Sequence, residues 1–166
     1  NAEPYEVIKS VRFNVSNETM QERDVTVEWQ LQDAAGMIKE SAEAEVHVPA
    51  LSAVWLYKVP LPQAELYSDH VFYMLKENGE IIGEGSVLFC QPKYYKFANP
   101  QLSVRVEGDE LVVTAAAYAK DVELLNENED WVLSDNYFDM EPGVRRVRIL
   151  RGCADNVRVR SAFDIR

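Results

Sequence analysis

Trp131 to Ile149, which reads WVLSDNYFDMEPGVRRVRI, is the stretch of sequence that decides the fold class. Its first part is rich in aromatic and β-prone residues and ends at Pro142-Gly143, a dipeptide typical of turns. After the turn, arginine and branched apolar residues alternate over Arg146–Ile149. Because side chains on a strand alternate between its two faces, the stretch predicts a half-buried antiparallel strand with another strand before the turn.

The first half of the chain reads as a series of strands. Val25, Val27, Trp29 and Leu31 alternate with polar residues, which is the period of a strand with one buried face. Asn78-Gly79 suits the positive φ angles of a tight hairpin turn. The other strands are expected over Glu6–Val15, Ala44–Val48, Val54–Val59, His70–Lys76 and Ile81–Phe89. The pattern predicts a meander of about six strands, with a bulge at Gly83-Glu84-Gly85.

The second half of the chain has the same character. Its strands are expected over residues 104–106, 111–118, 122–125, 131–138, 144–150 and 157–163. Neither half contains a convincing amphipathic helix of about ten or more residues. The predicted fold class is therefore all-β.

Length and charge favour two domains and exclude two classes of partner. The chain has 166 residues. Because small sandwiches run to roughly 100 residues or fewer, we expect one domain over residues 1–91 and another over 92–166. Residues 1–91 carry fifteen acidic and six basic side chains, a net charge of −9, and residues 92–166 carry thirteen and eleven, a net charge of −2. Because a surface this acidic repels phosphate groups, we expect no nucleic acid and no membrane as a partner. The sequence also lacks the run of apolar residues that a transmembrane helix needs and the layout of a signal peptide.

Several segments resemble the C-terminal part of a known enzyme family. Ser134–Asp139, followed by Met140 and Pro142-Gly143, is similar to a stretch in the last immunoglobulin-like domain of β-mannosidases of glycoside hydrolase family 2. Weaker matches to the domain junction and to the preceding sandwich lie at Phe89–Lys93, Asn99-Pro100, Val15–Thr19, Asp33–Gly36 and Val48–Ala50. The resemblance covers nearly the whole chain and implies two tandem immunoglobulin-like antiparallel β-sandwiches. It departs from the family at Met140-Glu141, where an apolar pair such as Leu-Leu is common.

The resemblance also implies that the chain by itself is not an enzyme. In this family both catalytic glutamates lie on a TIM barrel that precedes these domains, and such a barrel takes about 250 residues. We expect Glu28, Glu43, Glu45 and Glu84 to face solvent on strands or in loops. We therefore expect no catalytic residue, no cofactor and no metal.

The implied role is that of non-catalytic C-terminal accessory and structural domains, a fragment of a larger hydrolase of terminal β-mannosides. Its partners would be the catalytic barrel and the other domains of the parent chain, and its location the periplasm or the exterior of the cell. A β-galactosidase parent stays open. The alternatives are a carbohydrate-binding module, with an oligosaccharide as partner, and a cell-surface interaction module, which would show an unpaired edge strand.

The three tryptophans are candidates either for the core or for contact with a sugar. We expect Trp29 and Trp55 in the core, where a tryptophan of an immunoglobulin-like sheet usually lies. Trp131 borders the acidic loop Asn126–Asp130, and an aromatic face beside carboxylates can hold a sugar ring. Trp131 is therefore the one candidate carbohydrate contact. A strand-opening aromatic residue packed under its own loop is the alternative.

Other polar features carry weaker predictions. Asn126–Asp130 lacks the ligand spacing of a calcium loop, so we expect a solvated loop. Neither histidine, His47 or His70, has a second ligand at metal-binding spacing. Free thiols are expected rather than a disulfide between Cys90 and Cys153. An outward stripe that faces either an acidic neighbour or solvent is expected from Arg146, Arg148, Arg158 and Arg160. The glycan-acceptor sequons Asn14-Val15-Ser16 and Asn17-Glu18-Thr19 would matter only in a eukaryotic secretory pathway.

Overall fold

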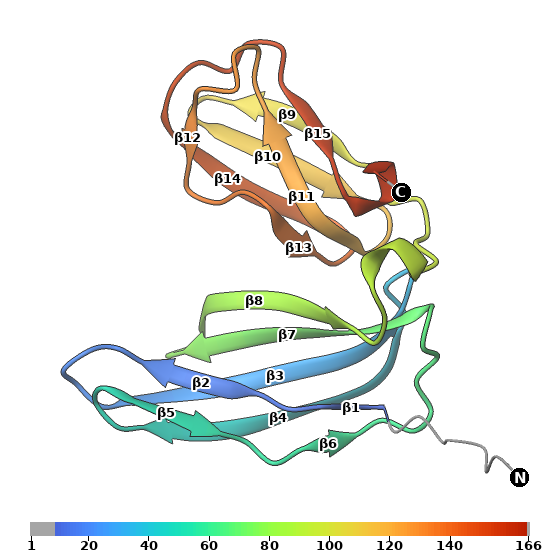
Figure 1. Cartoon of the computed structure of the whole chain (residues 1–166). Coiled ribbons are helices and arrows are strands. Elements are labelled where there is room, and N and C mark those ends of the chain that lie inside the picture. Colours follow the sequence, from blue (N-terminus) through green and yellow to red (C-terminus); the bar gives the residue numbers. More distant parts are fainter. Residues whose placement is uncertain (1–8, 166) are drawn as a thin grey trace, which may run out of the picture.

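The computed structural model describes residues 9–165, which form two β-sandwiches joined by a short linker (Figure 1). All strand pairs are antiparallel within the described part of the chain, and the only helices there are two short 3-10 turns. The fold class predicted from the sequence, all-β with two immunoglobulin-like sandwiches, is confirmed. The beginning of the strand expected over Glu6–Val15 falls on residues outside the described range.

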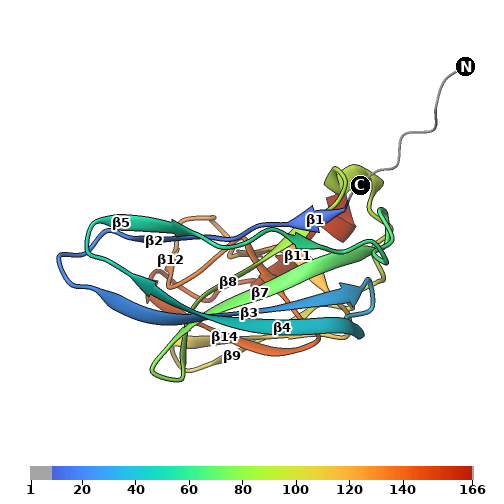
Figure 2. The same cartoon turned by 90° about the horizontal axis from the view of Figure 1, so that it is seen from below.

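The first sandwich contains eight strands. They are β1 (Ser10–Val11), β2 (Asn14–Asn17), β3 (Arg23–Asp33), β4 (Ile38–Val48), β5 (Ser52–Trp55), β6 (Val59–Pro60), β7 (Asp69–Glu77) and β8 (Glu80–Leu88). One layer is the sheet β4-β3-β7-β8, and the other consists of the pairs β2-β5 and β1-β6 (Figure 2). The long outer strand β4 and strand β8 form the two edges of the larger sheet.

The core of the first sandwich follows the alternation on β3. Val25, Val27, Trp29 and Leu31 all point into it, and Trp29 is 7% exposed, which confirms the prediction for this residue. The hairpin between β7 and β8 turns at Asn78 and Gly79, with φ angles of 52° and 80°, as expected for Asn-Gly. The bulge expected at Gly83-Glu84-Gly85 is not at these residues, which pair regularly with β7; the register shifts one residue earlier, at Ile82.

Trp55 is the exception, because its side chain is 59% exposed and the prediction that it lies in the core is wrong. On β5, Val54 and the following Leu56 pack against the core, so Trp55 between them points outward. The guanidinium of Arg12 lies over its ring, with Cζ 4.8 Å from the ring centroid.

Asn17 closes the turn between β2 and β3 and is 3% exposed. Its Nδ2 lies 2.8 Å from the carbonyl oxygen of Gln21 and 3.2 Å from those of Val48 and Pro49. Its Oδ1 accepts hydrogen bonds from the backbone and hydroxyl of Thr19, at 3.0 and 2.6 Å. Asn17 and Thr19 of the second sequon thus stabilise the sandwich through these hydrogen bonds.

The second sandwich begins after the 3-10 turn η1 (Pro92–Tyr94) and ends with η2 (Ala162–Ile165). Its strands are β9 (Ser103–Glu107), β10 (Glu110–Ala115), β11 (Ala119–Leu125), β12 (Val132–Leu133), β13 (Phe138–Met140), β14 (Gly143–Arg151) and β15 (Arg158–Arg160). One sheet has the order β12-β14-β10-β9 and the other the order β13-β11-β15. Leu111, Val113, Val122, Leu124 and Val147 are at the centre of the core between them.

The continuous strand expected over residues 131–138 is wrong. The segment divides into β12, which pairs with β14, and β13, which pairs with β11 in the opposite sheet. Between them Tyr137 has a φ of 57°, which a regular strand does not allow. The turn at Pro142-Gly143 therefore joins β13 to β14 across the sandwich and is not a hairpin within one sheet.

Candidate functional site: the seam between the sandwiches

A buried aromatic cluster joins the two sandwiches. Phe72 from β7, Tyr95 and Phe97 from the linker and Tyr118 from the second sandwich are all buried in it. The ring planes of Phe97 and Tyr118 stack at 26°, and the Tyr95 ring stands edge-on to Tyr118, with centroids 6.1 Å apart. Because these rings come from both sides of the linker, their burial holds the two sandwiches together. We refer to this cluster and its polar surroundings as the seam.

His70 lies at the centre of the seam and is 0% exposed. Its ring stacks on Tyr118 at a centroid distance of 3.5 Å. Its Nε2 lies 3.0 Å from Oε1 of Gln32, and its Nδ1 lies 2.8 Å from the hydroxyl of Tyr95. Burial, with a smaller effect from the charge of Lys120, lowers the pKa of His70 to about 3. The imidazole is therefore neutral near pH 7, and it packs against the aromatic rings of the seam while both of its nitrogens are hydrogen-bonded.

Gln32 fixes the tautomer of this histidine. The amide nitrogen of Gln32 donates to Oε1 of Gln30 and to Oε1 of Glu141, at 2.8 and 2.7 Å. Its oxygen is then left to accept a hydrogen bond from Nε2 of His70, so Nδ1 is the acceptor nitrogen. The hydroxyl of Tyr95 has two acceptors for its single proton, this Nδ1 at 2.8 Å and the carbonyl oxygen of Ser68 at 3.0 Å. Since Glu141 lies in the second sandwich, this network crosses the seam.

The signature segment supplies the second half of the seam. Asp139 on β13 accepts hydrogen bonds from the backbone nitrogen of Ser86 on β8 at 3.0 Å and from the Ser86 hydroxyl. It also accepts one from the backbone nitrogen of Asp121 at 2.9 Å and pairs with Lys120 at 3.3 Å. The hydroxyl of Tyr118 contacts that of Ser86. The Ser-Asp-Asn-Tyr-Phe-Asp motif thus does more than form strands, because its last residue attaches β13 to the first sandwich.

Glu84 corrects one of the sequence predictions. We expected it at a solvent-facing position, but it is half-buried and forms an ion pair with Arg145 of the second sandwich at 2.5 Å. Burial, together with the nearby carboxylates, raises the pKa of Glu84 despite the opposing charge of Arg145. Of the glycines on either side of Glu84, Gly85 accommodates the Tyr73 ring of the neighbouring strand β7, because a Cβ there would lie 2.6 Å from the Tyr73 hydroxyl. Of the other three glutamates, Glu43 and Glu45 are exposed and Glu28 pairs with Lys76.

Gly36 and Pro142 form the tightest contact of the seam. A Cβ atom at Gly36 would lie 2.5 Å from both Cδ and Cγ of Pro142, and the φ of Gly36 is +94°. Both the conformation and the contact therefore require glycine. The turn predicted at Pro142-Gly143 consequently packs against the turn that joins β3 to β4 in the first sandwich.

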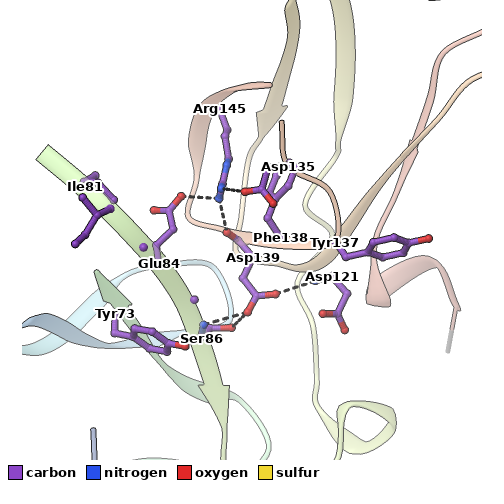
Figure 3. A pocket seen from close by; sticks show the side chains of 13 residues that line it. Tyr73, Ile81, Glu84, Ser86, Asp121, Asp135, Tyr137, Phe138, Asp139 and Arg145 are labelled. Atoms are coloured by element: carbon purple, nitrogen blue, oxygen red, sulfur yellow. Dashed lines mark hydrogen bonds and ion pairs between the residues drawn. The ribbon is translucent and has the colours of Figure 1, made fainter. Parts of the chain in front are cut away.

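A cleft of about 650 Å³ opens beside the seam, between β8 and the second sandwich (Figure 3). Tyr73, Ile81 and Ile82 line the side of the first sandwich, and Asp135, Asp139 and Arg145 line the other. Arg145 is central, because it pairs with Glu84 and Asp135 and donates to the carbonyl of Asp139 at 3.2 Å. Its guanidinium also lies over the ring of Phe138, 4.1 Å from the centroid.

The chemistry of this cleft is that of a structural contact. Donors already engage three of its carboxylates: Arg145 holds Glu84 and Asp135, and Ser86 with the Asp121 amide holds Asp139. A retaining glycosidase needs one carboxylate available as a nucleophile and another as an acid, about 5 to 5.5 Å apart. Within residues 9–165, moreover, no group of three His, Cys, Asp or Glu side chains is arranged to hold a metal ion.

Trp131, the sequence-predicted carbohydrate contact, lies half-buried against the core of the second sandwich. Its Nε1 donates to the carbonyl oxygen of Leu124 at 3.4 Å, and its Cβ and Cα lie close to Gly152. The adjoining acidic loop is closed by hydrogen bonds in both directions between Asn126 and Asp130. The contact of Trp131 with a sugar stays a prediction.

The four arginines expected to form one stripe lie on two different sheets. Arg146 and Arg148 are on β14, and Arg158 and Arg160 are on β15. Arg146 pairs with Glu107 and Glu110, Arg160 pairs with Glu123, and Arg158 donates to the carbonyl of Asn126. A single arginine stripe is therefore wrong, since each of these side chains serves its own sheet or loop.

The remaining polar predictions concern single residues. His47 is exposed on β4, beside Asp24 and Glu22, and these two carboxylates raise its pKa. Cys90 is half-buried and Cys153 exposed, and both thiols are free. No helix in residues 9–165 has the length and apolar character needed to cross a membrane.

Sequence reasoning missed Gln32, His70, Tyr95 and Tyr118 as members of one site. Each is a single residue on a different segment, and no periodicity connects them. The pair of glycines at Gly83-Glu84-Gly85 gave no signal for the seam either, because the side chains next to them, Leu75 and Tyr73, belong to β7 of the same sheet.

Comparison with known proteins places both halves in families. A family model described as Mannosidase Ig/CBM-like domain matches residues 9–94, and one described as Ig-fold domain matches residues 97–165. No curated protein sequence matches the chain.

Several solved structures share the fold. The β-D-mannosidase from Dictyoglomus thermophilum is similar with a TM-score of 0.75 at 16% identity, over 93% of this chain and 21% of that protein. The exo-β-D-glucosaminidase CsxA is similar with a TM-score of 0.66 at 13% identity, over 90% of this chain and 24% of that protein. The exo-chitosanase CsxA from Amycolatopsis orientalis is similar with a TM-score of 0.59 at 13% identity, over 89% of this chain and 25% of that protein. The chain thus spans a quarter or less of the length of each, and at these identities the likeness shows the fold alone.

Proposed function

Since the chain belongs to the Mannosidase Ig/CBM-like domain family through residues 9–94, we propose that it is the non-catalytic C-terminal part of a larger glycoside hydrolase. The observation that carries the proposal is the tandem order of the two matched domains, residues 9–94 and 97–165, in one chain. In a β-mannosidase of similar fold, the region that matches this chain makes up 21% of the polypeptide.

The role of the pair in such an enzyme is structural. The seam fixes the second sandwich against the first through apolar stacking, the His70 network and the Glu84–Arg145 ion pair. Two domains fixed in this way present one rigid surface to the rest of a polypeptide. The chemistry itself would belong to a TIM barrel elsewhere in the parent chain, because none of the seam carboxylates described above is poised for it.

The substrate that we propose for the parent enzyme is a terminal β-mannoside. The Mannosidase Ig/CBM-like match and the fold shared with a β-D-mannosidase support this choice. A glucosaminidase with the same fold makes β-glucosaminides the first competitor to test.

The reading frame upstream of the codon for Asn1 tests the accessory role. We expect it to continue into a barrel-sized domain with two glutamates at strand ends. The full-length enzyme would then be assayed on p-nitrophenyl glycosides, and we expect hydrolysis of the β-mannoside in preference to the β-glucosaminide and the β-galactoside. A frame that begins immediately upstream with no such domain would overturn the accessory role, and preference for another glycoside would overturn only the choice of substrate.

A carbohydrate-binding module is the alternative to the structural role, and Trp131 is its candidate residue. The isolated chain titrated with manno-oligosaccharides distinguishes the two. Affinity that disappears in Trp131→Ala while the fold is retained would favour the binding module. Under the structural role we expect no affinity in either protein.

A further inference from the structure

The outer face of the β2-β5 layer of the first sandwich carries an exposed apolar row. Ala53, Trp55 and Tyr57 point outward at alternate positions of β5 and its continuation, while Val54 and Leu56 pack inward. Trp55 is 59% exposed and Tyr57 is 97% exposed. We call Ala53, Trp55, Tyr57 and the neighbouring Arg12 the β5 face. Large aromatic side chains gathered in the open on one sheet face are typical of an interaction surface.

The second sandwich does not cover this face. The seam uses the larger sheet, through β3, β7, β8 and the turn between β3 and β4, together with the linker, whereas β5 pairs with β2 in the opposite layer of the first sandwich (Figure 2). In Figure 1, β7 and β8 lie between the β2-β5 pair and the strands of the second sandwich. Any cover for the β5 face must therefore come from outside the described chain.

The position of the row along the chain indicates which part of the parent enzyme would reach it. The backbone after β5 runs antiparallel to β2 and β1: Leu56 donates to the carbonyl of Phe13 at 2.9 Å, and Leu61 donates to that of Lys9 at 2.8 Å. Tyr57 consequently lies near the point where the polypeptide enters the first sandwich. Under the proposed function, the catalytic domain precedes that point and is held close to the β5 face by its direct connection to β1.

The charge of the β5 face distinguishes it from the rest of the first sandwich. Arg12 and the exposed Lys58 lie beside the row, although residues 1–91 have a net charge of −9. The Arg12 side chain is held in place, because its Nε donates to the carbonyl of Leu56 at 3.0 Å and its guanidinium lies over the Trp55 ring. A partner with an apolar centre and an acidic rim would be complementary to this arrangement.

A protein partner suits these residues better than a sugar. Tryptophan, tyrosine and arginine are the residues most enriched at the energetic centres of protein interfaces. A sugar ring stacks on an open aromatic face, and here the Arg12 guanidinium already occupies a face of the Trp55 ring.

We propose that the β5 face docks against the catalytic domain of the same polypeptide, with Trp55 and Tyr57 buried at the centre of the contact. This inference rests on the proposed function, because it needs a catalytic domain that precedes the first sandwich. It adds to that function the surface through which the accessory domains support the enzyme.

Oxidative footprinting of the full-length enzyme and of the isolated 166-residue chain tests the docking. Hydroxyl radicals oxidise exposed aromatic side chains, and mass spectrometry reports the rate at each residue. We expect Trp55 and Tyr57 to be oxidised several-fold more slowly in the full-length enzyme than in the isolated chain. Tyr94 and Tyr137, which are 57% and 65% exposed on other surfaces, are the matched controls and should react equally in both.

A pair of variants gives an independent measurement. Trp55→Ala combined with Tyr57→Ala should lower the Tm of the full-length enzyme by several degrees more than it lowers that of the isolated chain. Tyr94→Ala should affect the two proteins alike.

Equal oxidation of Trp55 and Tyr57 in the two proteins would overturn the docking while leaving the accessory role in place. Protection of these residues in the isolated chain by manno-oligosaccharides, without protection by the catalytic domain, would replace the docking with a sugar-binding platform. A gene that encodes no catalytic domain upstream would overturn the proposed function and the docking together.

Discussion

At the scale of single residues, the buried His70 makes the stability of the protein depend on pH. Its pKa is about 3 in the folded protein, against the 6.5 that is usual for a histidine in an unfolded chain. Between these values the unfolded chain binds a proton and the folded chain does not, so the free energy of unfolding falls as the pH falls from about 6.5 toward 3. The slope for one such group is at most about 1.4 kcal/mol per pH unit.

Urea unfolding at pH 7 and pH 5 measures this contribution. We expect the wild-type chain to lose stability between these pH values and His70→Gln to lose about 1–2 kcal/mol less, because the variant has no group to protonate. His47→Gln is the contrasting variant: because neighbouring carboxylates raise the pKa of His47, its removal should increase rather than reduce the loss of stability between pH 7 and pH 5. An identical loss of stability in the wild type and in His70→Gln would show that His70 does not titrate in this range.

Adding a single Cβ atom at Gly36 should lower the stability of the protein. Gly36→Ala puts a Cβ at a φ of +94° and against Pro142. Gly79→Ala is a matched control, because Gly79 has a φ of +80° with nothing within 4 Å of the added atom. We expect about 1–2 kcal/mol of destabilisation from the strained conformation in Gly79→Ala, and at least about 1 kcal/mol more in Gly36→Ala from the contact across the seam. Equal losses in the two variants, measured by denaturant unfolding, would mean that the sandwiches separate to make room.

Trp29 and Trp55 show what the sequence allows at this scale. Trp29 lies in a clean alternation of polar and apolar residues, which assigns it to the buried face of β3. Around Trp55 the run from Ala53 to Tyr57 is apolar throughout, so the period of two is present in the structure but invisible in the sequence. Only the packing of Val54 and Leu56 decides that Trp55 points outward.

At the scale of elements, Asn136 links the two sheets at the point where the chain crosses between them. The ladder between β11 and β13 pairs Val122 with Phe138, and its continuation would place Asn136 opposite Leu124. The backbone of Asn136 does not pair with β11, and its side chain makes the two hydrogen bonds to the Leu124 backbone instead. Oδ1 accepts from the Leu124 nitrogen at 2.8 Å, and Nδ2 donates to the Leu124 carbonyl oxygen at 3.1 Å.

Asn136→Ala should therefore leave the backbone nitrogen of the buried Leu124 without this acceptor, whereas the Leu124 carbonyl oxygen keeps only the longer hydrogen bond from Nε1 of Trp131, at 3.4 Å. We expect a loss of about 1–3 kcal/mol, the usual cost of such groups. Asn128→Ala, in the exposed acidic loop, should change the free energy of unfolding by less than about 0.5 kcal/mol. Denaturant unfolding of both variants is the measurement. A loss in Asn136→Ala no larger than that in Asn128→Ala would show that water satisfies Leu124.

The elements divide clearly into those that the sequence could predict and those that it could not. The β7–β8 hairpin was predictable because Asn-Gly determines its turn locally. The division of residues 131–138 between two sheets was not, since it depends on the hydrogen bonds of Asn136 to a strand twelve residues away. The family resemblance identified this segment but did not predict that it divides between the two sheets.

At the scale of the whole molecule, the seam should make two domains unfold as one. It combines buried rings from both sides with four hydrogen-bonded or ion-paired contacts to Asp139. We expect a single calorimetric transition for the wild-type chain, because neither sandwich can lose its fold without exposing the seam of the other.

Asp139→Ala removes the acceptor of these contacts. We expect a destabilisation of roughly 3 kcal/mol and a division of the thermal unfolding into two transitions. Asp109→Ala, at an exposed turn of the second sandwich, should keep the single transition. Scanning calorimetry of the three proteins is the measurement, and a single transition in Asp139→Ala would show that the remaining contacts of the seam suffice to couple the domains.

The seam itself could not be predicted from the sequence. Gln32, His70, Ser86 and Asp139 come together only when both sandwiches have formed. Asp139 belongs to the signature segment, but nothing in that segment indicates which residues of the first sandwich it contacts. The division of the chain at residues 91 and 92 rested on length and on the resemblance, and it stays a prediction.

The closed turn around Asn17 has a consequence for the choice of expression host. In a eukaryotic secretory pathway, sequons are modified while the chain is still unfolded. A glycan on Nδ2 of Asn17 would occupy the nitrogen that must reach the carbonyls of Val48 and Pro49, whereas one on the exposed Asn14 would project into solvent. Secreted material should therefore carry sugar at Asn14 alone, because chains modified at Asn17 would be retained and degraded, and a bacterial host would give the higher yield.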